Sequence, residues 1–242
     1  FIHESNSFAG KSNIMLGKKA TKVFTGTAGM EKFFPKEKIK VTGNPVRLAI
    51  TQAGISRSEG IKFFGLDENK KTVLVVGGSL GAKSINEAID KDLDKLLNAG
   101  LQLIWQTGKP YSQKAKERTA GKSSVWVNEF ITRMEHAYAA ADIVVARSGA
   151  MTVAELCVVK KPVLFVPYPF AAEDHQTVNA MQLVNQHAAM MIKDVETSDK
   201  LVPMSIELAN DESRQDEMKK NIASLAITNA DKIIAEEILK LI

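Results

Sequence analysis

A turn at residues 145–155, with the sequence VARSGAMTVAE, carries the residues most able to do chemistry in this chain. It follows an apolar, strand-like run and passes through Ser148 and Gly149 into a helical pattern that contains Glu155. Small residues at a strand-to-helix turn let backbone N–H groups approach an anion, and the helix N-terminus adds partial positive charge. An acidic side chain just beyond can accept both hydroxyls of a ribose. Phosphate donors beside a diol acceptor predict a site for a nucleotide diphosphate.

The same stretch has a purely structural alternative. Thr152 and Glu155 have the spacing of a capping box, in which the acidic side chain only closes the start of a helix. Capping boxes are common, so this stretch by itself leaves the ligand site and the helix cap open as alternatives.

A second glycine-rich turn, GGSLGA at 77–82, follows an apolar, β-branched run at 71–76 and precedes a helical pattern. It has neither the spacing of a dinucleotide fingerprint nor the Gly-Lys-Ser/Thr ending of a Walker A loop. It does stand at the carboxyl end of a predicted strand, where open α/β sheets bind ligands, and the Ser79 hydroxyl could donate to a phosphate oxygen. A tight turn that needs positive φ is the structural alternative. Two such turns in one repeating pattern favour the ligand site.

The elements that must position these turns alternate from residue 72 onward. Short apolar runs predict strands, and the stretches between them predict helices. The predicted strands are 72–76, 101–106, 123–128, 142–146, 162–167 and 188–192. The predicted helices are 83–98, about 111–118, 133–140, 150–159 and 176–186. This alternation predicts the α/β class, with a doubly wound parallel Rossmann-like sheet.

The two ends of the chain differ from this central part. Residues 201–242 are helical in pattern, whereas residues 1–45 contain predicted strands and end at a Gly-Asn-Pro turn. We therefore expect a remnant of a second Rossmann-like domain at 1–45, a ligand-binding Rossmann-like domain at 46–220, and a carboxy-terminal helical segment at 221–242. Because the strand-like start has no initiator Met, we also expect further sequence before Phe1.

The composition is that of a globular protein with an anionic partner. The net charge of +4 and the pI of about 9.0 suit an anionic ligand or an anionic membrane surface. No dense Lys/Arg stripe with interleaved aromatic residues is present, so we expect no nucleic acid partner. Cys157 is the single cysteine, which excludes a disulfide framework within the chain and fits a reducing cytoplasm. The longest apolar runs are strand-sized, so the sequence predicts no membrane-spanning helix.

Several motifs occur in a recognisable order along the chain. They are HESN at 3–6, Ala9-Gly10 with Asn13, GNPVR at 43–47, GGSLGA at 77–82, WQTG at 105–108, Phe130-Ile131 with Met134, RSGAMTVAE at 147–155, and DHQ at 174–176 with Asn179-Ala180. This set resembles the MurG family of bacterial N-acetylglucosaminyltransferases, and the match covers essentially the whole chain. Its most specific part is the stretch that ends in Glu155.

The resemblance implies a glycosyltransferase of the GT-B type, with two Rossmann-like domains. Such an enzyme transfers GlcNAc from UDP-GlcNAc, with inversion, onto the C4 hydroxyl of the muramoyl sugar of lipid I, undecaprenyl-diphospho-muramoylpentapeptide. The product is lipid II for peptidoglycan synthesis. The implied partners are UDP-GlcNAc, lipid I and the cytoplasmic face of the cell membrane, where the enzyme would be peripheral. The resemblance implies no cofactor and no metal.

The resemblance also implies a set of donor-binding residues. Asn6 and Arg47 would contact the donor from the far side of the cleft and the hinge, Ser79 would bind the diphosphate, and the backbone of Ile131 would read the uracil edge. Gln176, with His175, would recognise GlcNAc hydroxyls. The turn that would cradle the phosphates comprises Ala150, Met151, Thr152, Val153, Ala154 and Glu155, and Glu155 would hold the ribose diol.

The chain departs from the family in one respect. The amino-terminal Gly-rich loop, with its proposed catalytic histidine, is absent, so the catalytic base is left unassigned and His3 is expected to be structural. We expect this chain alone to bind UDP-GlcNAc weakly and to transfer nothing. Apart from the resemblance, Asp174 could simply cap the helix expected at 176–186.

Two other function classes stay open beside the transferase. A UDP-sugar epimerase uses a similar two-domain fold, and it would need carboxylates or histidines that face the sugar; only Asp174 and His175 are candidates. A non-catalytic nucleotide-binding module would need the turns alone. A nicotinamide dehydrogenase is disfavoured, because the six-residue glycine fingerprint and its partner acid are missing.

Overall fold

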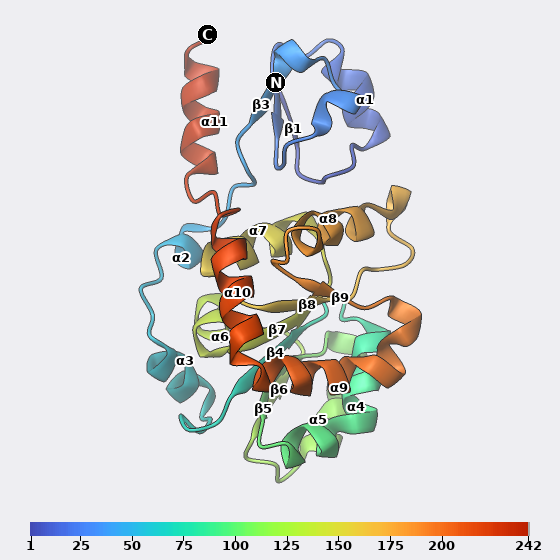
Figure 1. The fold of residues 1–242 in the computed structure, drawn as a ribbon, viewed down its shortest axis with the longest axis vertical. Helices are drawn as coiled ribbons and strands as arrows, with labels where there is room; N and C mark the ends of the chain where they lie inside the picture. Colours follow the sequence, from blue (N-terminus) through green and yellow to red (C-terminus); the bar gives the residue numbers. More distant parts are fainter. Residues whose placement is uncertain (242) are drawn as a thin grey trace.

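Two parallel β-sheets stand one above the other along the long axis of the molecule in the computed structural model, which describes residues 1–241 (Figure 1). The larger sheet has six strands in the order β6-β5-β4-β7-β8-β9, and every pairing in it is parallel. Its strands are β4 (Thr72–Val76), β5 (Gln102–Gln106), β6 (Val125–Asn128), β7 (Ile143–Ala146), β8 (Val163–Phe165) and β9 (Met190–Met191). The expected parallel α/β sheet is confirmed.

Both faces of this sheet are buried, which explains why its strands are continuously apolar. Val73 and Val75 belong to one core and Leu74 to the other, because successive side chains of a strand point to opposite faces. Helices with apolar stripes cover each side. The first face holds α4 (Lys83–Asn98), α5 (Lys109–Thr119) and α9 (Thr197–Asn210); the second holds α3 (Arg57–Phe64), α6 (Met134–Ala140), α7 (Ala150–Val159) and α8 (His175–Val184).

The helical pattern expected at 201–242 is confirmed, and the structure divides this part of the chain among three helices. They are α9, α10 (Glu212–Ala223) and α11 (Ala230–Leu239). The break between α9 and α10 has a local cause: the Asp211 carboxylate accepts a hydrogen bond of 2.9 Å from the Arg214 N–H and so caps a new helix. The expected boundary at residue 220 lies inside α10, and the chain leaves this helix only after Ala223.

The amino-terminal unit is a small parallel sheet with its own core. Its strands are β1 (Ile2–Glu4), β2 (Val23–Thr25) and β3 (Ile39–Val41), paired in that order. The other elements are α1 (Lys11–Gly17), η1 (Met30–Lys32) and η2 (Lys36–Lys38). The core contains Ala9, Val23, Met30 and Phe34. Gly17 is required beside it, because a Cβ at this position would lie 2.6 Å from the Phe34 ring.

Two chain crossings join the units, and the second returns the end of the chain to the amino-terminal sheet. Residues 42–47 lead from β3 to α2 (Leu48–Thr51), and residues 224–229 lead from α10 to α11, which lies beside β3 (Figure 1). Gly43 has a φ of 77°, and a Cβ there would lie 2.8 Å from Ile227. Lys40 of β3 and Glu237 of α11 form an ion pair at 3.9 Å. Spatially, α11 therefore belongs with residues 1–45.

The strand order places the two glycine turns side by side. β4 pairs with β5 on one flank and with β7 on the other, although β5 and β6 lie between β4 and β7 in the sequence. This reversal of direction is a topological switch point, and ligands of open α/β sheets bind in the crevice at the carboxyl ends of such strands. The loops after β4 and β7 both open there.

Candidate functional site

A cleft of about 970 Å³ lies at the carboxyl edge of β4 and β7. The glycine turn after β4 and the start of α4 form one wall, and the turn into α7 together with the loop after β8 forms the other. The cleft lining includes Gly78, Gly81, Gly149, Thr152 and Gln176. The tertiary structure thus brings part of each predicted turn to one cleft. The predicted residues Ala150, Val153 and Ala154 line a different cavity.

The loop 77–82 is built by close contact between two backbones. Gly78 and Gly81 have φ angles of 83° and 76°, which favour glycine. A Cβ on Gly81 would lie 2.1 Å from the Thr107 carbonyl oxygen, and one on Gly108 would lie 2.3 Å from the Gly81 nitrogen. At Gly81 the glycine is therefore required by the tight turn itself, which was the structural alternative for this loop. Ser79 stands exposed at the tip, where its hydroxyl is free to meet an anion.

Helix α7 begins without a side-chain cap. Gly149 is the N-cap residue, and the first N–H that finds an intrahelical acceptor is that of Val153, which donates to the Gly149 carbonyl at 3.0 Å. The N–H groups of Ala150, Met151 and Thr152 therefore stand at the open positive end of the helix. Gly149 and Thr152 line the cleft, so this end suits a phosphate.

The capping-box alternative for Glu155 is wrong, because the helix already starts at Ala150. The Glu155 carboxylate instead accepts hydrogen bonds from the Arg47 guanidinium at 3.3 Å and from the Tyr138 hydroxyl at 2.9 Å. Burial, together with the adjacent Glu155 carboxylate, raises the pKa of Tyr138 well above its usual value, so this hydroxyl stays a donor. The side chain of Glu155 is 13% exposed. It is therefore a positioned acceptor that keeps some access to solvent.

Arg147, the first residue of RSGAMTVAE, holds several walls of the cleft together. Its guanidinium is 13% exposed and pairs with the Asp194 carboxylate. It also donates to the carbonyl oxygens of Val166 at 3.1 Å and Pro167 at 3.0 Å, and to the Ser84 hydroxyl at 3.1 Å. The loop after β8, the start of α4 and the segment after β9 are fixed to one another through this side chain.

His175 and Gln176 are the first two residues of α8, and of these two Gln176 lines the cleft. Gln176 lines the cleft, and its side-chain oxygen accepts a 3.0 Å hydrogen bond from the Tyr168 N–H. The Nδ1–H of His175 donates to the Ala172 carbonyl at 2.7 Å. Glu173 and Asp174 have φ angles of 53° and 50°, which are strained for residues with a Cβ. Strain of this kind persists only where the surroundings enforce it and is common at ligand sites.

The expected cap by Asp174 is only partly present. Asp174 is the N-cap residue of α8, but its side chain makes no hydrogen bond to the helix backbone. Its carboxylate accepts instead from the Thr177 hydroxyl at 2.7 Å.

The turn after β6 differs from the expectation in one detail. Phe130 is half exposed, whereas Ile131 is buried. The Ile131 N–H, which the resemblance assigns to a uracil edge, donates to the Gln106 side-chain oxygen at 3.1 Å. The main-chain donor expected here is therefore already engaged within the protein.

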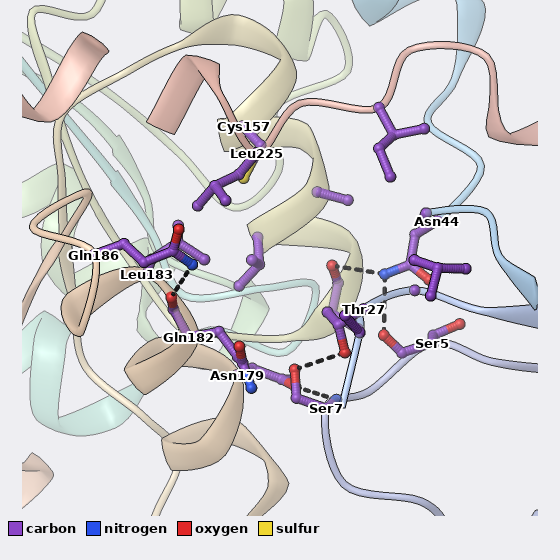
Figure 2. A pocket seen from close by; sticks show the side chains of 18 of the residues that line it. Ser5, Ser7, Thr27, Asn44, Cys157, Asn179, Gln182, Leu183, Gln186 and Leu225 are labelled. Carbon is purple, nitrogen blue, oxygen red and sulfur yellow. Dashed lines mark hydrogen bonds between the residues drawn. The ribbon is translucent and has the colours of Figure 1, made fainter. Parts of the chain in front are cut away.

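The amino-terminal unit reaches the site through Asn6 and Arg47. Arg47 pairs with Glu155 across the first crossing. Asn6 accepts a 3.1 Å hydrogen bond from the side chain of Asn179 on α8, and Asn179 also accepts from the Ser7 N–H at 2.8 Å. A second, uncharged cavity of about 310 Å³ lies beside this contact, on the hinge side of α7 and α8 (Figure 2).

Three other candidate features are placed by the structure. Burial raises the pKa of the Cys157 thiol to about 12, which fits a packed helix residue and not a nucleophile. Among residues 1–241, no group of three or more His, Cys, Asp or Glu side chains could hold a metal ion. In the same part of the chain, no helix is both long and apolar enough to cross a membrane.

Three side chains that build the site were not among the predicted site residues. Arg147, Gln106 and Asn179 are polar residues that are almost or fully buried. Gln106 and Arg147 each stand at the carboxyl end of a predicted strand, and that position was the available signal. Their partners could not be predicted, because each lies on another element.

A comparison with family models matches residues 72–238 to the "Glycosyltransferase family 28 C-terminal domain". A curated relative from Parabacteroides distasonis is 48% identical over 243 aligned residues, which cover 100% of this chain and 66% of the relative. Its name is UDP-N-acetylglucosamine--N-acetylmuramyl-(pentapeptide) pyrophosphoryl-undecaprenol N-acetylglucosamine transferase. This chain therefore spans slightly less than two thirds of the length of that relative.

Among solved structures, MurG of Acinetobacter baumannii matches with a TM-score of 0.81 at 28% identity, over 99% of this chain and 66% of that one. This match and the family model confirm the GT-B type of α/β fold and the resemblance drawn from the motifs. A UDP-N-acetylglucosamine 2-epimerase matches with a TM-score of 0.62 at 17% identity, over 93% of this chain and 58% of that one, and it shares the fold alone.

Proposed function

Because the chain belongs to glycosyltransferase family 28, we propose that it is the donor-binding part of an inverting N-acetylglucosaminyltransferase of the MurG type. The enzyme would move GlcNAc from UDP-GlcNAc onto the C4 hydroxyl of the muramoyl sugar of lipid I. The product would be lipid II for peptidoglycan synthesis.

The observation that carries this proposal is the cleft at the switch point. The exposed tip at Ser79 and the uncapped start of α7 offer hydrogen-bond donors from the two sides of the cleft. Phosphate oxygens accept such bonds, and the helix end stabilises negative charge. During transfer the leaving group is a nucleoside diphosphate whose charge grows as the glycosidic bond breaks. Donors preorganised at that charge lower the barrier without a cation.

Two acceptors are proposed for the rest of the donor. Glu155 lies one helical turn after Thr152 of the cleft lining, and its carboxylate is held by Arg47 and Tyr138. Gln176 lines the same cleft on the far wall, where a sugar attached to the second phosphate would lie. We assign the ribose to Glu155 and GlcNAc hydroxyls to Gln176, with His175 beside it.

The catalytic base stays unassigned in this proposal. His3 is not offered for the role, because both ring nitrogens are engaged: Nε2 with the Gly43 carbonyl at 3.1 Å and Nδ1 with the Ser5 hydroxyl at 3.2 Å. These contacts fix the first crossing against β1 and give His3 a structural function.

We further propose that the enzyme works as a peripheral protein at the cytoplasmic face of the cell membrane. Its acceptor would carry an undecaprenyl chain, so the reaction must occur at a lipid surface. Met15 and Leu16 on α1 are 73% and 56% exposed and stand next to the exposed Lys18 and Lys19. Apolar side chains beside cations favour an anionic membrane surface.

The first test is calorimetric titration of the chain with UDP, ADP and GDP. We expect UDP to bind in preference to both purine nucleotides, and equal affinity for all three would overturn the uridine site. The second test is transfer of labelled GlcNAc from UDP-GlcNAc to a short-chain lipid I analogue, run on this chain and on the longest form of the protein that can be expressed. Epimerisation of the donor in the absence of acceptor would favour the epimerase instead.

A further inference from the structure

Gln106 is a buried side chain that joins two loops assigned to the proposed donor site. It is the last residue of β5, is 2% exposed, and lies between the loop after β4 and the turn after β6. Its side-chain nitrogen donates to the Gly78 carbonyl at 2.9 Å, and its side-chain oxygen accepts from the Ile131 N–H at 3.1 Å. One amide therefore holds two loops.

The first bond fixes the direction of the Gly78–Ser79 peptide. The Gly78 carbonyl accepts from Gln106 and also from the Gly81 N–H at 3.0 Å, so it points into the protein. No peptide bond in residues 1–241 is cis, and in a planar trans peptide the N–H points opposite to the C=O. The Ser79 N–H therefore points away from Gln106. It has no hydrogen-bond acceptor within the described residues, and its neighbours Gly78 and Leu80 line the cleft.

The second bond fixes the Phe130–Ile131 peptide by the same rule. Because the Ile131 N–H points at Gln106, the Phe130 carbonyl points away from it. No group within residues 1–241 donates to this carbonyl. The Phe130 side chain beside it is 50% exposed, so this turn reaches solvent.

We propose that Gln106 is a positioning residue of the donor site, which orients the Ser79 N–H toward the diphosphate and the Phe130 carbonyl toward the nucleobase. This rests on the proposed function. The donor and the acceptor match the ligand. The Ser79 N–H can donate to phosphate oxygens, and the Phe130 carbonyl can accept from the N3–H of uracil. We expect the Ile131 N–H to stay on Gln106 when the nucleobase binds. Since one planar amide sets both groups, it also fixes the spacing between the base site and the phosphate site.

Gln102 provides a matched control at the other end of the same strand. It is fully buried, and its amide bonds to the Asp67 N–H at 2.9 Å, the Asp67 carbonyl at 2.8 Å and the Thr72 hydroxyl at 2.8 Å. These contacts lie at the amino end of β5, away from the cleft. Substitution of Gln102 removes a buried amide from β5 without touching either loop of the site.

The experiment compares Gln106→Met with Gln102→Met, since methionine keeps the length of the side chain and loses both hydrogen bonds. Thermal melting and calorimetric titration with UDP are measured for wild type and both variants. We expect Gln106→Met to weaken UDP binding about tenfold and Gln102→Met to weaken it less than twofold, with a melting temperature lowered at least as much. Unchanged UDP affinity in Gln106→Met, or an equal loss in both variants, overturns the positioning role. A wild-type chain that fails to bind UDP overturns the proposed function and this inference with it.

A measurement on the wild-type chain keeps the inference testable if Gln106→Met does not fold. Backbone amide resonances are followed by NMR during titration with UDP. We expect a large shift at the Ser79 amide and a small one at the Ile131 amide, which stays bound to Gln106. A large shift at Ile131, with a changed Gln106 side-chain amide, would show that the base displaces Gln106 and would refute the assignment.

Discussion

Glu155 accepts two hydrogen bonds from residues of other elements, and these contacts determine whether its substitution should affect folding or ligand binding. Its partners are the Arg47 guanidinium on the first crossing and the Tyr138 hydroxyl on α6. Neither bond supports the start of α7, so Glu155 contributes little to that helix. The proposed role of its carboxylate is instead to accept the ribose hydroxyls of the donor.

We predict that Glu155→Ala weakens UDP binding more than it weakens folding. A carboxylate that accepts two ribose hydroxyls contributes roughly 1.5–3 kcal/mol, which corresponds to a loss of affinity of about 10- to 100-fold. Calorimetric titration and thermal melting measure the two effects on the same preparation. A lowered melting temperature with unchanged affinity would refute the ribose role.

The chain contains a true capping box that serves as the control. Ser56 accepts from the Glu59 N–H at 3.2 Å, and the Glu59 carboxylate accepts from the Ser56 N–H at 2.8 Å. Glu59→Ala should therefore lower the melting temperature and leave UDP affinity as in wild type.

Gln176 should discriminate between the sugar and the nucleotide. We predict that Gln176→Ala lowers affinity for UDP-GlcNAc and leaves affinity for UDP unchanged, because the start of α8 lies where the sugar is expected. Gln182→Ala, at an exposed position on the same helix, is the control and should change neither affinity. Equal losses for the two ligands with Gln176→Ala would mean that the start of α8 contacts the nucleotide.

At the scale of elements, Lys161 closes the carboxyl end of α6. Its ammonium donates to the Ala141 carbonyl at 2.6 Å, where a cation is favourable beside the unpaired carbonyls of a helix end. Burial opposes this and lowers the pKa of Lys161 to about 8. Charge on this side chain therefore stabilises the helix end and also costs desolvation.

The lowered pKa of Lys161 predicts a pH dependence of stability. Between about pH 8 and the unfolded value of 10.5, the unfolded chain binds more protons than the folded one, so the Lys161 contribution to stability rises with pH. We predict that the free energy of unfolding of wild type, relative to Lys161→Met, increases by up to roughly 3 kcal/mol from pH 7 to pH 10.5. Urea unfolding at several pH values measures this. Parallel curves for the two proteins would contradict it, and Lys160→Met at the exposed neighbouring position is the control.

At the scale of the whole molecule, the two units meet through a few polar contacts. Asn179 of α8 donates to Asn6 and to the Ser148 carbonyl, each at 3.1 Å. It also accepts from the Ser7 N–H at 2.8 Å (Figure 2). It is 2% exposed. One side chain therefore connects the amino-terminal unit to the turn into α7.

We predict that Asn179→Ala loosens the amino-terminal unit without unfolding the larger one. A buried N–H left without a partner costs about 1–3 kcal/mol, and here the orphaned group is that of Ser7. Hydrogen exchange should become faster at β1, β2 and β3 and stay unchanged at β4 and β7. Asn185→Ala, at an exposed position, should leave both units as in wild type. Equally faster exchange in both sheets of the Asn179 variant would show that the units unfold together.

The sequence by itself determined the fold class and the positions of the two turns. Apolar runs separated by amphipathic stretches predicted the strands of the larger sheet to within a few residues. This was possible because the pattern of buried and exposed side chains in one strand or helix is set by residues close together in the sequence. The same local signal gave the glycine turns, and the motifs gave the family. It did not separate a capping box from a ligand acceptor at Glu155, since both require the same spacing.

Only the tertiary structure decided which of these elements meet. The pairing of β4 with β7, the return of α11 to β3, and the partners of Arg147, Gln106 and Asn179 all join residues that other elements separate in the chain. Local periodicity carries no information about such pairs, because it records that a side chain is buried and not what it is buried against. The orientation of the peptide groups at Ser79 and Phe130 depends on one amide from a neighbouring strand, so it exists only once the sheet has formed.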